Sequence, residues 1–115
     1  MEKNIILLES IYQGGTFHGA SLEFEEDKDG VSTPVSMVGA IVNMDIKRFN
    51  EIVAVYSTTN GKLTITDNKI NIVKHNPTLK AGLHEFDFHI VMPDGDIEPG
   101  IAQGEWTIKE PKTLR

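Results

Sequence analysis

Hydrophobic and polar residues alternate along much of this chain, and the alternation is clearest in residues 82–109. The apolar positions of this stretch are Phe86, Phe88, Ile90, Trp106 and Ile108. The polar positions between them include Glu85, Asp87, His89 and Glu105. A Pro-Asp-Gly sequence at 93–95 separates the two halves, so the pattern predicts two strands, each with one buried and one solvated face.

The same period of two occurs earlier in the chain. In residues 38–47 the apolar positions are Ala40, Val42, Met44 and Ile46. The β-branched run at 52–56 suits a buried strand. Asn60 and Gly61 are predicted to form a tight hairpin turn, because both tolerate the left-handed backbone region. Residues 76–82 are the only candidate helix, and they provide one turn at most.

The spacing of these elements indicates the fold class. About seven to nine short strands, with no long segment of helical period, are typical of an all-β chain. We therefore expect an antiparallel β-sandwich, most simply an immunoglobulin-like one. Residues 13–110 would form this domain, after an N-terminal arm or edge strand at 1–12 and before a polar tail at 111–115.

The N-terminal region contains a short continuous apolar run, formed by Ile5, Ile6, Leu7 and Leu8. This run fits either a strand buried on both faces or an arm that packs on a neighbouring molecule. It is shorter than the apolar region of a signal peptide and is flanked by acids, and no stretch reaches the length of a membrane span. We therefore expect the protein to be soluble and made in the cytoplasm.

Charge and composition narrow the classes of partner. The 115 residues include 17 acids and 11 bases, which gives a net charge of −6. The bases form no continuous run, so binding to nucleic acid or to an anionic membrane is not expected. The chain has no Cys, which excludes a disulfide scaffold, a thiolate zinc site and a thiol nucleophile.

No arrangement of residues in the sequence predicts a catalytic centre. Strand alternation alone would place Glu85, Asp87 and Glu105 on one face, so their proximity is weak support for paired carboxylate chemistry. The chain contains no nucleophile motif and no phosphate-binding loop. The acidic turns at 27–30 and 94–98 give only a weak signal for a divalent ion. We therefore expect a protein that is not an enzyme and that has no cofactor and no metal.

The four histidines are also expected to be structural. They lie at positions 18, 75, 84 and 89, and they are predicted to be surface or rim residues. His84 and His89 are five residues apart, so they should face opposite sides of one strand and cannot bind one ion together within it.

Several segments, taken in order, resemble motifs of a known domain family. They are residues 13–17 (QGGTF), 34–48, 59–65, 81–88 and 103–108. Their order and spacing are similar to those of a small immunoglobulin-like domain found in tailed-phage virion proteins. The family includes the N-terminal domain of baseplate upper proteins and related tail and head-fibre proteins, and the resemblance spans about residues 13–110.

This resemblance implies a non-enzymatic structural protein of the virion, synthesised in the host cytoplasm. The expected partners are other virion structural proteins, and a homo-oligomer is expected as well. The predicted interaction residues are Ile5, Ile6, Leu7, Leu8, Glu85, Asp87, His89 and Glu105. The alternative is a carbohydrate- or host-surface-binding module, which would need exposed aromatic residues such as Tyr12, Tyr56 and Trp106, or a metal site.

Overall fold

The structure is a computed structural model that describes residues 4–110, without the side chains of residues 4–5, 26–28 and 98–102. The predicted C-terminal tail at 111–115 therefore lies outside the described residues. Between residues 4 and 110 the chain forms strands and no helix, which confirms the prediction of an all-β chain. No helix in this range is long and apolar enough to cross a membrane.

The described range contains eleven strands, more than the seven to nine expected. They are β1 (Asn4–Leu7), β2 (Ile11–Tyr12), β3 (Ala20–Glu23), β4 (Glu25–Lys28), β5 (Val31–Pro34), β6 (Ile41–Arg48), β7 (Glu51–Ser57), β8 (Leu63–Thr66), β9 (Lys69–Ile72), β10 (Gly82–Val91) and β11 (Ile97–Lys109). The excess comes from short elements such as β2 and the strands of the β4–β5 hairpin.

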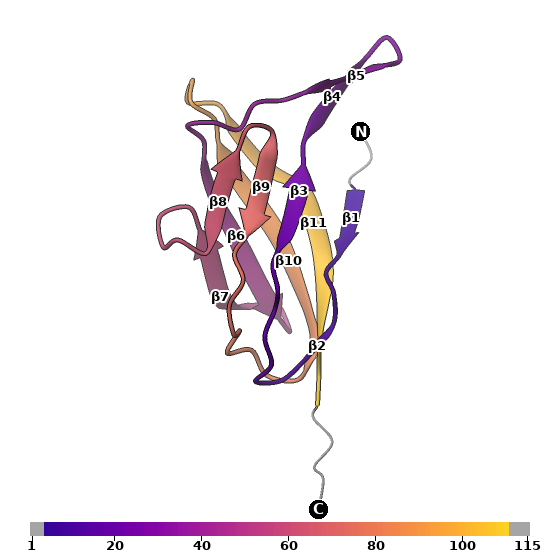
Figure 1. The fold of residues 1–115 in the computed structure, drawn as a ribbon, viewed down its shortest axis with the longest axis vertical. Helices are drawn as coiled ribbons and strands as arrows, with labels where there is room; N and C mark the ends of the chain where they lie inside the picture. Colours follow the sequence, from indigo (N-terminus) through magenta and orange to yellow (C-terminus); the bar gives the residue numbers. More distant parts are fainter. Residues whose placement is uncertain (1–3, 111–115) are drawn as a thin grey trace, which may run out of the picture.

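Six strands form the larger sheet, which has the order β1-β11-β10-β6-β7, with β2 also paired to β11 (Figure 1). Strands β6, β7, β10 and β11 pair in antiparallel fashion. Strands β1 and β2 run parallel to β11. The sheet is therefore mixed, and the prediction of a purely antiparallel arrangement is wrong at its N-terminal edge.

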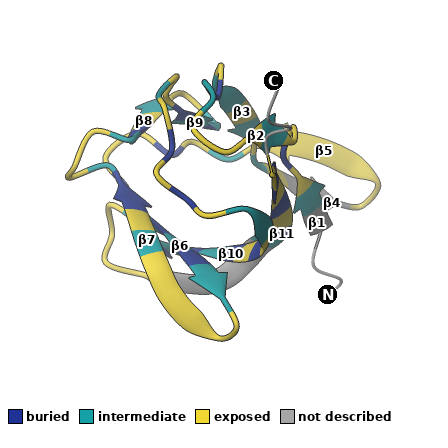
Figure 2. Cartoon of the chain, turned by 90° about the horizontal axis from the view of Figure 1, so that it is seen from below, coloured by how far each residue is buried: buried dark blue, intermediate teal, exposed yellow. Residues whose placement is uncertain are grey.

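A three-stranded sheet, β3-β9-β8, lies across from the larger one, and the β4–β5 hairpin projects beyond it (Figures 1 and 2). Buried side chains of both sheets form one hydrophobic cluster. On β6 these are Val42, Met44 and Ile46, which confirms the inward face predicted from their alternation. The predicted inward residues of β10 and β11, including Phe86 and Trp106, are buried in the same cluster.

Trp106 is the centre of an aromatic group within this core. Its side chain is 0% exposed, and its ring packs edge-on against that of Phe17, with the centroids 4.9 Å apart. The indole Nε1–H donates a hydrogen bond to the Glu9 carbonyl over 3.0 Å. Tyr56 and His75 lie beside it, joined by a hydrogen bond of 2.6 Å between the phenol oxygen and Nε2. The N-terminal segment is thus tied to the core through a polar contact.

The N-terminal apolar run forms an edge strand of its own domain, because β1 pairs with β11 of the same chain. Its residues differ in exposure: Leu8 is buried in the core, Ile6 is half-buried, and Leu7 is 74% exposed. The interpretation as a strand buried on both faces is therefore wrong. Leu8 belongs to the core of its own domain and Ile6 packs against that core, so of these three only Leu7 presents a largely exposed side chain, and the role of the run in an interaction stays a prediction.

Two predictions about strands and turns fail around β7. The run at 52–56 was expected to be buried, but β7 is an edge strand, and Ile52, Val53 and Val55 are exposed (Figure 2). The segment containing Asn60 and Gly61 is not a hairpin turn, because it connects β7 in one sheet to β8 in the other. The Asn60 side chain instead holds this connection together by accepting hydrogen bonds from the backbone N–H groups of residues 57 and 62.

Two further predictions fail near β10. The segment at 76–81 forms no helical turn, and β10 begins at Gly82 directly after it. His84 is not a surface residue: it is 1% exposed, and its Nδ1 lies 3.2 Å from the Gly82 carbonyl oxygen. Burial lowers the pKa of His84, because a charged imidazolium loses hydration there, and the nearby positive charge of Arg48 lowers it further.

Candidate functional site

The polar residues predicted to share a face do lie together on the outer face of the six-stranded sheet. Glu85, Asp87 and His89 alternate along β10, and Glu85 is directly opposite Glu105 on β11. On the other side of β10, Asp87 is directly opposite Asp45 of β6. The strand register therefore brings carboxylates from three adjacent strands onto one surface.

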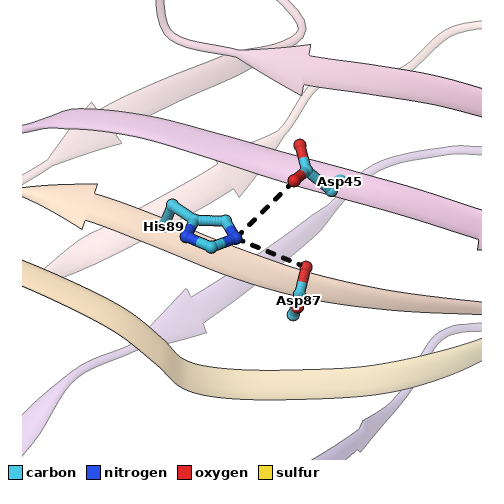
Figure 3. A group of neighbouring side chains, drawn as sticks. All are labelled: Asp45, Asp87 and His89. Atoms are coloured by element: carbon cyan, nitrogen blue, oxygen red, sulfur yellow. Dashed lines mark ion pairs between the residues drawn. The ribbon is translucent and has the colours of Figure 1, made fainter. Parts of the chain in front are cut away.

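Three of these side chains form a compact group, the Asp45–Asp87–His89 cluster (Figure 3). His89 Nε2 lies 3.6 Å from Asp45 Oδ2 and 3.8 Å from Asp87 Oδ1. The side chains of Asp45 and Asp87 are 19% and 29% exposed, and that of His89 is 44% exposed. The cluster is thus half-buried but open to solvent on the imidazole side.

The cluster is not held together by direct hydrogen bonds. Both distances from His89 Nε2 exceed the usual hydrogen-bond range of about 2.7–3.2 Å. Asp87 Oδ1 is buried and has no hydrogen-bond partner among the described residues. The other oxygen of this carboxylate, Oδ2, lies 3.8 Å from Lys47 Nζ. The carboxylates of Asp45 and Asp87 therefore lie close together, and Lys47 is near only one oxygen of Asp87. Such an arrangement attracts a further positive charge.

Asp45 is the member of the cluster that the sequence alone did not single out. The alternation of apolar and polar residues in 38–47 indicates only that Asp45 faces away from the core. Its position beside Asp87 depends on β6 pairing with β10 in one particular register. No local signal in the sequence specifies that register, so the convergence of the three side chains could not be predicted from spacing.

A shallow hollow of about 220 Å³ adjoins the cluster on the same face. It is lined by Lys47, Asn50, Glu85, Phe86, Asp87, Gln103, Gly104 and Glu105. Most of these side chains are polar or charged, so the hollow is suited to polar contacts rather than to an apolar ligand.

Exposed apolar residues surround the charged centre of this face, and we refer to them as the apolar fringe. The fringe consists of Leu7 on β1, Ile41 on β6, Ile52 and Val55 on β7, and Leu83 on β10. Their strand partners are outward-facing residues, which places them on the same side of the sheet as Asp45 and Glu105. An exposed surface that combines apolar side chains with charges is typical of a protein interaction site.

The turn between β6 and β7 presents a second unusual feature. Phe49 is 84% exposed and has a φ of 53°, a left-handed conformation that is rare for a bulky residue. The Arg48 guanidinium lies over its ring, 4.9 Å from the centroid. Such backbone strain costs of the order of 1–2 kcal/mol, and residues that retain it often have a functional role.

The three aromatic residues that were expected to stack on a sugar do not share an exposed surface. Trp106 and Tyr56 are buried in the core, and Tyr12 is half-exposed with Lys109 Nζ 5.0 Å from its ring centroid. The carbohydrate-binding alternative needs exposed aromatic residues or a metal site, and the burial of Tyr56 and Trp106 removes most of its aromatic support.

The fold and the site together define an all-β domain with one charged sheet face bordered by apolar residues. Comparison with known protein families found no family model that matches the chain, and comparison with curated proteins found no similar sequence. The resemblance to phage virion domains therefore stays a prediction.

Proposed function

We propose that this chain is a non-enzymatic structural domain of a tailed-phage virion, with an immunoglobulin-like β-sandwich that docks on another virion protein. The order of the strands supports the fold part of the proposal. With β3, β8 and β9 taken as strands B, D and E of the immunoglobulin fold, the smaller sheet has the order B-E-D. With β6, β10 and β11 taken as C, F and G, the larger sheet has the order C-F-G, and β7 takes the place of strand C′.

The observation that carries the docking function is the composition of the outer face of the six-stranded sheet. Glu85 and Glu105 are directly opposite each other on adjacent strands, a pairing of like charges that destabilises an isolated sheet. Exposed apolar side chains surround them. A partner that contributes basic side chains would relieve the repulsion and cover the apolar fringe at the same time.

This charge pattern favours a different protein over a second copy as the occupant of the face. Two copies meeting through it would bring Glu85 and Glu105 against the same acids of the partner, and like charges across an interface are unfavourable. The expected homo-oligomer would therefore use another surface. The backbone edge of β7 is the surface we favour, because no strand among the described residues pairs with β7 on the side away from β6.

The acidic charge of the chain also supports the part of the proposal that excludes nucleic acid and membranes as partners. The net charge of −6 and the acidic face disfavour contact with phosphates of nucleic acid or lipid. The protein would be synthesised in the host cytoplasm and become part of the virion through protein contacts alone.

The test compares two double variants with the same change in net charge. Glu85→Lys with Glu105→Lys reverses the centre of the docking face. Glu25→Lys with Asp96→Lys is the control, because both residues are exposed and lie outside that face. Each pair is introduced into the gene in the phage, and the amount of the chain in purified particles is measured by quantitative mass spectrometry.

We expect the face variant to fall at least tenfold in the particles, while the control variant stays at the wild-type level. Light scattering on the purified proteins would show the same oligomeric mass for both variants if self-association uses another surface. Equal incorporation of both variants would refute docking through this face. Absence of the wild-type chain from purified particles would refute the virion assignment itself.

A further inference from the structure

We propose that Asp45, Asp87 and His89 bind one divalent transition-metal ion, such as Zn²⁺, on the outer face of the six-stranded sheet. The inference rests on the geometry of the cluster and is independent of the proposed docking function. It also departs from the expectation, drawn from the sequence, that the chain binds no metal.

The first argument is the spacing of the ligand atoms. Zinc lies about 2.0–2.2 Å from imidazole nitrogen and carboxylate oxygen, so two ligands of a tetrahedral ion are about 3.4 Å apart. The corresponding distances from His89 Nε2 are 3.6 Å to Asp45 and 3.8 Å to Asp87. One ligand atom from each residue lies within 4.8 Å of the others. Side-chain movements of a few tenths of an ångström would bring both carboxylates to this spacing from His89, and the two carboxylates would move toward each other as they close on the ion.

The second argument is the unsatisfied oxygen of Asp87. Its Oδ1 atom is buried and without a hydrogen-bond partner among the described residues, although a buried carboxylate oxygen ordinarily has one. Lys47 approaches the other oxygen of the carboxylate, so it does not compensate Oδ1. The unsatisfied atom faces His89 Nε2, which is where an ion shared by the cluster would be coordinated (Figure 3).

The third argument is the rigidity of the positions that hold these ligands. Asp45 and Asp87 are directly opposite each other on β6 and β10, and both strands are hydrogen-bonded on each side. Ligands on paired central strands keep their geometry better than ligands on loops. The site therefore needs little reorganisation when the ion binds.

The ligand types indicate the class of ion. An imidazole nitrogen with two carboxylates suits Zn²⁺ and neighbouring transition metals, whereas Ca²⁺ and Mg²⁺ prefer oxygen ligands alone. Three protein ligands leave a fourth position open to solvent or to a side chain of a docked protein. The competing account is that a protonated His89 simply forms ion pairs with both aspartates, and the experiment is chosen to distinguish the two.

The experiment titrates the tag-free full chain with ZnCl₂ by isothermal calorimetry and with CoCl₂ by visible absorption. The variants Asp45→Asn and His89→Gln remove one ligand each. His18→Gln is the matched control, since His18 is exposed and lies outside the cluster. We expect one ion per chain, visible bands of bound Co²⁺, and affinity that falls at least tenfold in both ligand variants but is unchanged in the control.

A second measurement keeps the proposal testable even if a variant folds poorly. In two-dimensional NMR of the wild-type chain, Zn²⁺ should shift the amide signals of residues near Asp45, Asp87 and His89 and leave those of β8 and β9 in place. Absence of binding at 1 mM Zn²⁺ would overturn the proposal and favour the ion-pair account. Equal loss of affinity in the His18→Gln control, or shifts centred on another histidine, would overturn it as well.

Discussion

Replacing Gly104 by Ala tests how closely β1 and β11 approach each other. Gly104 is a buried residue of β11 that is directly opposite Ile6 of β1 on one side and Phe86 of β10 on the other. A Cβ atom at this position would overlap the carbonyl oxygen of Ile6 and the end of the Phe86 ring, and it would lie 2.9 Å from the Ile6 carbonyl carbon. The Phe86 ring thus occupies the space that the missing side chain leaves.

The loss of stability caused by Gly104→Ala depends on how far the atoms around the new Cβ can move. The Phe86 ring can rotate away only into a packed core, and overpacking of this kind costs about 1–3 kcal/mol. The Ile6 carbonyl belongs to the β1–β11 ladder, so it can move only if hydrogen bonds of that ladder lengthen or break. We therefore expect a loss of about 3 kcal/mol in the free energy of unfolding. For a domain of this size that corresponds to a fall in Tm of roughly 10 °C or more.

The assay is urea unfolding followed by the fluorescence of Trp106, the only tryptophan in the chain. Gly95→Ala is the control. Gly95 has a φ of 95°, but no atom lies within 4 Å of the position that a Cβ would take, so its cost of about 1 kcal/mol is purely conformational. Hydrogen exchange should also show faster exchange in β1 of the Gly104→Ala protein. A Gly104→Ala protein as stable as the Gly95→Ala protein would refute the close packing of β1 on β11.

Three further variants test other parts of the fold. Burial lowers the pKa of His84 in the folded state, so its contribution to stability is complete above the unfolded pKa of about 6.5 and declines as the pH falls below it. His84→Leu should flatten urea midpoints measured between pH 7 and 5, and an unchanged slope would contradict this assignment. Phe49→Asn should raise the free energy of unfolding by about 0.5–1 kcal/mol, because Asn tolerates the left-handed conformation, and a loss of stability would show that Phe49 is not strained. Burial raises the pKa of Tyr56 to about 12, so stability should decline as the pH rises from 10 to 12, since the unfolded phenol ionises first. Tyr56→Phe should abolish this decline and cost about 1–2 kcal/mol at pH 7 by leaving His75 Nε2 without its partner, whereas Tyr12→Phe should do neither.

The alternation of residue types predicted the inward faces of the long strands because the side-chain period of a strand is a local property. Val42, Met44 and Ile46 are buried where the pattern placed them, and so are Phe86 and Trp106. These assignments need no knowledge of which strands are neighbours. The assignments hold for β6, β10 and β11, which are the inner strands of the sheet and have one face covered by the core.

Predictions that depended on which strands are neighbours failed, because strand pairing is not a local property of the sequence. The β-branched run of β7 has the composition of a buried strand, but Ile52 and Val55 are exposed because β7 is at the edge of the sheet and one of its faces is uncovered. Asn60 and Gly61 have the residue types of a hairpin turn, but the strands on either side belong to different sheets. Residue preferences describe a local conformation, and the pairing of strands is decided by long-range contacts.

The candidate site depends both on the local alternation of residues and on the pairing register of the strands. Its two proposed roles, metal binding and docking, use different side chains and can be tested separately. The polar face of β10 was predictable from alternation, whereas the contribution of Asp45 came only from the β6–β10 register. A bound ion would offset the charges of Asp45 and Asp87 but leave Glu85 and Glu105 free to meet a basic partner. His89→Gln should therefore lower the affinity for the metal at least tenfold and leave incorporation into particles intact. The reversal of both glutamates should do the opposite, and a variant that lost both properties together would show that the ion and the partner share one site.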